Sequence, residues 1–285
     1  MEACQIRRSP QSAAMKPTAP PDAPSISAGA RRPRWQRVLA WLALGTGLLV
    51  LALIGVGFVL DEPRPHVAPS AEADVVAHAV ERAVNVAAWE RTGAVRWTFA
   101  GQRSHLWDRA RSLVRVRWGS VEVQLRGTWG RAWRDGVEVR GAERNSLVAQ
   151  AWSGFVNDSF WLNPCAKLFD PGTHRALIAL PGGGRGLLVS YASGGVTPGD
   201  AYLWELPPAG RGDTPRAWKM WVSIIPIGGV EASWEHFVTL ATGARVATRH
   251  RLGPVTLRLD DVAGAATLAE LEPGADPFAK LLAPR

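Results

Sequence analysis

An uncharged apolar run from Val38 to Leu60 is the feature that most constrains how this chain can fold. At about 1.5 Å per residue, a helix of this length exceeds the roughly 30 Å hydrocarbon core of a bilayer. Basic residues precede the run and acidic residues follow it, namely Arg31, Arg32, Arg34 and Arg37 on one side and Asp61 and Glu62 on the other. Because basic flanks stay in the cytoplasm, we expect a single-pass inner-membrane protein with a cytoplasmic N-terminus and a periplasmic C-terminal domain.

Two other interpretations of the run are weaker. A buried core helix needs no cluster of arginines at one end, and the apolar core of a cleaved signal peptide usually has only about 7 to 15 residues. We therefore expect an uncleaved signal anchor and keep cleavage as the alternative. Met15 is an alternative start that leaves this topology unchanged.

The run divides the chain into four expected parts. Residues 1–37 are rich in Pro, Ala and Ser, so we expect a disordered basic tail. Residues 38–60 are the predicted transmembrane helix, and residues 61–70 form a short, proline-stiffened linker. Residues 71–285 show no second change in composition, which favours one periplasmic domain. The excess of Arg over Lys, with abundant Ala, Gly and Pro, is typical of a high-GC bacterial genome.

Net charge argues against a nucleic-acid partner, and the positions of the cysteines argue against a disulfide. Seven Lys or Arg and two acidic residues give residues 1–37 a charge of +5, which leaves only +3 of the total +8 for the rest. The basicity is therefore mostly topogenic, and we expect no nucleic-acid partner. Cys4 and Cys165 would lie on opposite sides of the membrane, so no disulfide is expected between them.

Hydrophobic periodicity predicts an α+β domain. Apolar residues three and four apart predict a helix over Ala71–Trp89, and alternation predicts a strand from Ala94. Ser112–Trp118 and Val121–Arg126 are joined by Gly119-Ser120, which predicts a two-residue hairpin. This turn would pair Trp118 with Val121, Val116 with Val123, Val114 with Leu125, Arg117 with Glu122, and Arg115 with Gln124.

The rest of the chain predicts mainly strands in one extended antiparallel sheet. One further helix is expected over Asn145–Val156, where Leu147, Ala151 and Phe155 share a face. Glycine- and proline-rich loops separate the strands, and Pro181–Gly186 is expected to be a hairpin turn. The predicted strands are Gly130–Val139 (with a turn at Asp135-Gly136), Ala176–Leu180, Leu187–Ala192, Ala201–Leu206, Ala217–Ile225, Glu231–Leu240, Arg245–Arg251 and Val255–Asp261.

Catalytic motifs are missing from the sequence. There is no GxSxG, HExxH, CxxC or GxxxxGK[ST] pattern and no zinc-type spacing of Cys and His. His174, His236 and His250 are far apart, and Glu231 and Glu235 would lie on one strand face without bracketing a substrate atom. We therefore expect no enzyme activity, no metal and no cofactor.

Tryptophan is unusually abundant, with fourteen in the chain. Large indoles fill the gap between a curved sheet and its helices, and this structural interpretation covers many of them. A concave sheet lined by such residues would also form a pocket for greasy ligands. The residues predicted to line it are Trp97, Phe99, Val114, Val116, Trp118, Val123, Trp161, Trp204 and Trp221.

The block NDSFWLNPCAKLFDPGT, from Asn157 to Thr173, resembles a pattern in uncharacterised bacterial envelope proteins. Their fold is like that of the outer-membrane lipoprotein carrier LolA and its receptor LolB. For this block we expect a helix exit at Asn157-Asp158, a strand through Phe160–Leu162, a break at Asn163-Pro164 and a turn at Asp170–Gly172. The resemblance implies an incomplete β-barrel, covered by a few helices, whose cavity holds acyl chains.

These observations favour a membrane-anchored periplasmic half-barrel that binds a lipid or a lipoprotein acyl chain without catalysis. The alternative is a cell-envelope assembly module that meets a protein partner and holds no ligand. The third hypothesis is an enzyme that processes envelope glycan or lipid, which would require polar groups to converge in the cavity. The inner membrane is the expected partner in all three.

Overall fold

The computed structural model describes Trp41, Thr46 and residues 60–193 and 198–283. The chain divides into two units, residues 1–53 and 54–285, and the fold below is that of the second. The predicted transmembrane run lies outside the described residues, apart from Trp41, Thr46 and Leu60. Within the described part, no helix is long and apolar enough to cross a membrane.

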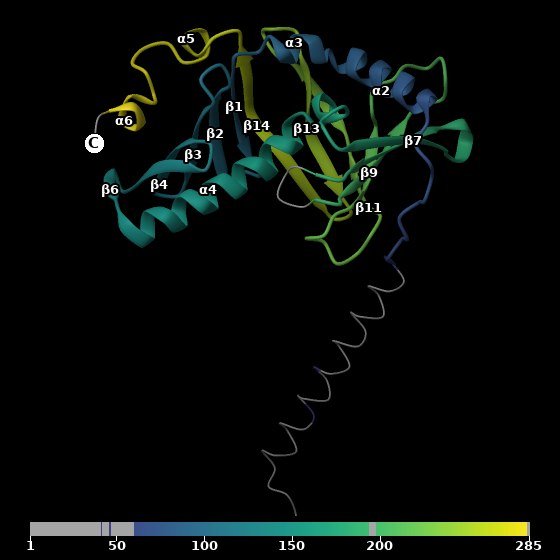
Figure 1. Cartoon of the computed structure of the whole chain (residues 1–285), viewed down its shortest axis with the longest axis horizontal. Helices are drawn as coiled ribbons and strands as arrows, with labels where there is room; N and C mark the ends of the chain where they lie inside the picture. The colour runs from purple at the N-terminus through teal and green to yellow at the C-terminus, as the bar shows by residue number, and fades with distance from the viewer. Residues whose placement is uncertain (1–40, 42–45, 47–59, 194–197, 284–285) are drawn as a thin grey trace, which may run out of the picture. The chain divides into compact units, whose positions relative to one another are not determined.

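Two antiparallel sheets and a few helices make the domain an α+β fold, as predicted (Figure 1). The expected single sheet is wrong, because the strands divide into a nine-stranded and a five-stranded sheet. The nine-stranded order is β12 (Glu235–Thr239), β13 (Arg245–Leu252), β14 (Val255–Ala265), β1 (Ala94–Phe99), β2 (Arg103–Asp108), β3 (Leu113–Trp118), β4 (Val121–Arg126), β5 (Trp129–Arg134) and β6 (Val137–Val139). The five-stranded order is β11 (Val230–Ser233), β10 (Ala217–Trp221), β9 (Ala201–Leu206), β8 (Arg185–Tyr191) and β7 (Thr173–Ala179).

The β3–β4 hairpin has the predicted register at all five predicted pairs, from Trp118 opposite Val121 to Val114 opposite Leu125. The turn at Asp135-Gly136 is also confirmed, because it joins β5 to β6. The loop from Pro181 connects β7 to β8 through the short η2 (Pro181–Gly183), as expected of a turn. Local turn chemistry and cross-strand pairing agree in these segments, so the sequence was sufficient to predict their turns and strand pairing.

The predicted strand over Glu231–Leu240 is wrong, since it breaks at Trp234 into β11 and β12. These strands belong to different sheets. The backbone N–H of Trp234 donates to the carbonyl of Arg216 (2.7 Å), and His236 adopts a left-handed φ of 53°. Glu231 and Glu235 therefore do not share one strand face. The predicted Ala217–Ile225 strand also ends early, at Trp221.

The predicted Ala71–Trp89 helix is interrupted at Asn85, which separates α2 (Ala71–Val84) from α3 (Val86–Glu90). Asn85 has a left-handed φ of 57°, which ends α2. Its side chain accepts from the N–H of Ala88 (3.3 Å) and donates to the carbonyl of Gly243 (3.0 Å). Asn85 therefore caps α3 and ties this helix pair to the loop between β12 and β13.

Helix α4 (Gly141–Leu162) is longer than the predicted helix and corrects two expectations. The chain does not leave the helix at Asn157-Asp158, and Phe160–Leu162 is its last turn, not a strand. The helix ends where Asn163 and Pro164 begin the short η1 (Pro164–Lys167). The turn at Asp170–Gly172 is confirmed by a hydrogen bond from Thr173 N to Asp170 O (3.1 Å).

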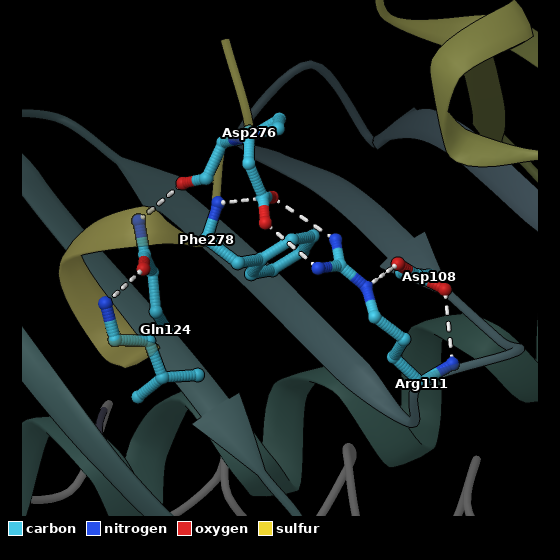
Figure 2. A network of polar contacts seen from close by, with 7 residues as sticks. Asp108, Arg111, Gln124, Asp276 and Phe278 are labelled. Carbon is cyan, nitrogen blue, oxygen red and sulfur yellow. Dashed lines mark hydrogen bonds and ion pairs between the residues drawn. The ribbon is translucent and has the colours of Figure 1, made fainter. Parts of the chain in front are cut away.

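Residues near the C-terminus pack on the face of the nine-stranded sheet opposite α4, through α5 (Leu268–Leu271) and α6 (Ala279–Leu282). Figure 2 shows the contacts that hold this segment. Phe278 is fully buried, and Arg111 donates to both carboxylate oxygens of Asp276 (2.7 and 3.0 Å) and to Asp108 (2.5 Å). Gln124 donates to one backbone carbonyl of the segment and accepts from one of its N–H groups (2.9 and 3.2 Å).

Candidate functional site

A cavity of about 440 Å³ lies between the C-terminal half of α4 and the five-stranded sheet. Its volume is within the usual range of small-molecule sites, about 300 to 1,000 Å³. Most of the side chains that line it are apolar or aromatic. They include Phe155, Phe160 and Trp161 of α4, Tyr191, Tyr202, Trp218 and Met220 of β8 to β10, Val222, Ile224 and Ile225 after β10, and Trp89 and Trp107 at the far end.

Aromatic rings form one wall of the cavity, and Phe160 is in contact with three of them. Its ring centroid lies 5.0 Å from that of Tyr202, 5.8 Å from Tyr191 and 5.9 Å from Trp218. Trp161 packs edge-on against Trp218 at 4.9 Å. Alternation in β9 and β10 places Tyr202 and Trp218 on the same inner face, so the last turn of α4 and the sheet together shape an apolar wall.

Charged and polar groups are confined to parts of the cavity wall. Arg109 donates to the carbonyls of Trp89 and Thr92 and lies over the rings of Trp89 (4.6 Å) and Trp107 (5.2 Å). Burial lowers the pKa of Arg109 from its ordinary value. Lys167 and Asp170 form an ion pair with 3.3 Å between Nζ and Oδ2, and both side chains are partly exposed. A ligand would therefore meet a mainly apolar wall that also presents polar and charged groups, among them Arg109, Lys167 and Asp200.

Helix α4 is fixed over the nine-stranded sheet by Asp158, whose side chain is fully buried. Arg103 donates to both of its oxygens (2.8 and 2.9 Å), Nε2 of His105 lies 2.8 Å from Oδ2, and Asn157 Nδ2 donates to Oδ1 (2.9 Å). Burial alone would raise the pKa of Asp158, but the hydrogen bonds from His105, Arg103 and Asn157 hold it below the ordinary value. This cluster sets the position of the cavity wall.

Burial disfavours the protonated form of His105 in this cluster. Burial lowers its pKa, and this effect outweighs the neighbouring carboxylate. The ring stacks on Trp97 with 4.5 Å between centroids, and Nδ1 has no hydrogen-bond partner among the described residues. Nε2 of His105 and the guanidinium of Arg103 thus share the carboxylate of Asp158.

The structure places one predicted pocket residue at the cavity and the others elsewhere. Trp161 lines the cavity. Five of the others lie in the packed core between α4 and the nine-stranded sheet, namely Trp97, Phe99, Val114, Val116 and Val123. The partly buried Trp118 packs against this core. Trp204 is buried beside Trp218 (4.8 Å between centroids). Trp221 faces away and donates to the carbonyl of Glu62 (2.7 Å).

Several cavity residues were not predicted, among them Tyr191, Tyr202, Met220, Ile224 and Ile225. Tyr202 lies within a strand that was predicted correctly, so alternation along that strand was an available signal for it. Ile224 and Ile225 follow β10 in a loop, and no periodicity identifies a loop residue as part of a wall. The block from Asn157 to Thr173, by contrast, supplies eight lining residues, from Asn157 to Asp170.

Groups suited to metal binding do not converge in the described residues. Among residues 60–193 and 198–283, no three His, Cys, Asp or Glu side chains lie close enough to hold a metal ion. His250 is buried, and its Nδ1 donates to the carbonyl of Ser233 (3.0 Å). Burial lowers the pKa of His250 to about 4. His174 is exposed on β7, and so is His236 on β12.

No protein-family model and no curated protein matches the chain.

Proposed function

We propose that this protein is anchored in the inner membrane by residues 38–60 and binds an apolar ligand, a lipid or lipoprotein acyl chain, in the cavity beneath α4. The observation that carries the proposal is the 440 Å³ cavity with its wall of Phe160, Tyr202 and Trp218. Burying an acyl chain against such a wall gains about 25 cal/mol for each Å² of apolar surface removed from water. The proposed function is binding without any chemical change of the ligand.

Architecture supports the proposal in a second way. The LolA-like resemblance rests on the block from Asn157 to Thr173, and this block forms the α4 side of the cavity. Asp158 of the block is buried in the ion cluster that fixes the helix, while Phe160 and Trp161 line the cavity. One short stretch of sequence thus combines a positioning group with apolar lining groups, which is what a preformed apolar site requires.

Filling the cavity tests the proposal. Ser159 lines it, whereas Ser153 lies on the exposed face of the same helix. We expect Ser159→Trp to weaken binding of a dansyl-labelled fatty acid by the full chain in detergent at least tenfold, since the indole takes the ligand's place. A tenfold loss corresponds to about 1.4 kcal/mol.

Ser153→Trp is the matched control and should bind like the wild type. Circular dichroism of both variants checks that the fold is retained. Equal binding by the wild type and Ser159→Trp would refute the proposed site. No binding by any of the three proteins, together with a crosslinked protein partner, would favour the assembly-module hypothesis instead.

A further inference from the structure

The chain segment that follows the apolar run is attached to the loop between β10 and β11. Glu62 N donates to the carbonyl of Gly228 (3.1 Å), and the N–H of Gly228 donates to Oδ1 of Asp61 (2.7 Å). Trp221 Nε1 donates to the carbonyl of Glu62 (2.7 Å). Leu60, the last residue of the run, lies two positions from Glu62, or about 7 Å of extended chain at most. The end of the run is therefore held beside this loop.

Two glycines make this attachment feasible. A Cβ at Gly228 would lie 2.6 Å from the carbonyl oxygen of Glu62 and 2.6 Å from Cδ1 of Trp221, closer than real Cβ contacts. Gly229 has a φ of +75°, and a Cβ there would lie 2.5 Å from the Cβ of Glu62. Only glycine at these positions allows the segment to approach so closely.

The loop from Val222 to Gly229, VSIIPIGG, is uncharged. Some of its side chains line the cavity, and others are exposed to solvent. Val222 and Ile225 line the ligand cavity. Ile224 also borders it, yet 67% of its surface is exposed, which makes it one of the most exposed large apolar side chains among the described residues. Pro226 beside it is exposed as well. An exposed apolar tip on the wall of an apolar cavity indicates a contact with an apolar partner.

Acidic residues flank this loop, and those of the linker have partners within the protein. Glu62 is paired with Lys219 (2.7 Å between Nζ and Oε2), and the side chain of Asp61 accepts from the loop backbone. Both acidic residues of the linker are therefore bonded within the protein, whereas Glu231, two residues after the loop, is exposed. Such pairing limits the repulsion of the linker carboxylates from anionic headgroups.

We propose that the Val222–Gly229 loop contacts the surface of the membrane that anchors the chain, so that the cavity takes its ligand directly from that leaflet. This inference rests on the proposed function and names the source of its ligand. A side chain such as Ile224 would then lie about 5 to 10 Å into the boundary between headgroups and acyl chains. The linker contacts hold the loop where the chain leaves the bilayer.

Depth-dependent fluorescence quenching tests this contact in the full chain. The Cys4→Ser protein carries Ile224→Cys labelled with the NBD fluorophore, in nanodiscs of phosphatidylethanolamine and phosphatidylglycerol with or without doxyl-labelled lipid. Cys165 is buried and stays unlabelled. The matched control is Val137→Cys, also a β-branched residue, 69% exposed, on the edge strand β6 of the other sheet.

We expect doxyl lipid to quench the label at position 224 with a depth of about 5 to 10 Å, and to leave position 137 unquenched. Equal quenching at the two positions would overturn the inference. Fatty-acid binding by the unlabelled wild type and by Ser159→Trp in the same nanodiscs separates the two proposals. If position 224 stays in water while binding persists and Ser159→Trp abolishes it, the loop contact fails and the proposed function stands.

Discussion

Replacing Asp158 by alanine should destabilise the domain far more than the same replacement of an exposed aspartate. Its side chain is fully buried, and the substitution leaves the guanidinium of Arg103 and the ring of His105 without their shared partner. Breaking a buried ion pair by removing one member typically costs about 3 to 5 kcal/mol. Because Arg103 is 31% exposed and water can replace part of the loss, we expect about 3 kcal/mol for Asp158→Ala.

Asp170→Ala is the matched control, since Asp170 pairs with Lys167 at 3.3 Å but its side chain is 44% exposed, in contrast to the fully buried Asp158. An exposed pair of this kind contributes about 0 to 1 kcal/mol. At about 2 to 4 °C per kcal/mol, the melting temperature should fall by about 6 to 12 °C for Asp158→Ala and by less than about 4 °C for the control. Circular dichroism of the full chain in detergent measures both shifts.

The difference between wild type and Asp158→Ala should also depend on pH. The folded-state pKa of Asp158 is held below its ordinary value, so its contribution is complete above about pH 4 and falls as the pH drops through the folded pKa. Similar melting temperatures for Asp158→Ala and Asp170→Ala at pH 7 would refute the assignment of Asp158 as the group that fixes α4.

Three further predictions concern other parts of the domain. Burial lowers the pKa of His250 to about 4, so the unfolded chain takes up its proton first, and acidification from about pH 6.5 to pH 4 should cost about 3 kcal/mol through this residue. Chemical denaturation should show a shallower pH dependence for His250→Phe than for the wild type; identical slopes would contradict this. Phe278→Ala should cost about 3 to 5 kcal/mol, whereas exposed Leu282→Ala should stay within about 0.5 kcal/mol, and a small effect at Phe278 would show that the C-terminal segment is not integral to the fold. Burial raises the pKa of the Cys165 thiol, so in the Cys4→Ser protein it should react with a disulfide reagent only after unfolding, and fast labelling of that protein in its native state would contradict the buried placement of Cys165.

Sequence patterns predicted the segments in which local chemistry and tertiary pairing agree. The Gly119-Ser120 turn and the alternation on either side of it determine the β3–β4 register. Strand β2 was missed because His105 and Asp108 are buried polar residues within it, which breaks the contrast between an apolar and a polar face. The cost of burying these polar groups is offset by hydrogen bonds, from His105 to Asp158 and from Arg111 to Asp108, and alternation alone cannot reveal such partners.

Division into two sheets and the position of the cavity were not accessible from periodicity. Glu231–Leu240 reads as one strand, whereas in the structure the hydrogen bond from Trp234 to Arg216 and the left-handed φ of His236 mark the break between its halves. Tryptophan abundance pointed to an apolar interior, but an indole that fills the core has the same sequence signature as one that lines a cavity. Trp97 and Trp161 illustrate this, because the first is packed in the core and the second faces the cavity.

Native mass spectrometry of the full chain, extracted from its own membrane in mild detergent, tests the central claim most directly. Wild type and Ser153→Trp should each carry one acyl-bearing lipid or lipoprotein species, because both have an open cavity. Ser159→Trp should carry none, because the added indole fills that space. A wild-type spectrum that contains only the bare polypeptide, or bound lipid of equal abundance in all three proteins, would contradict the proposal that the cavity beneath α4 holds an apolar ligand.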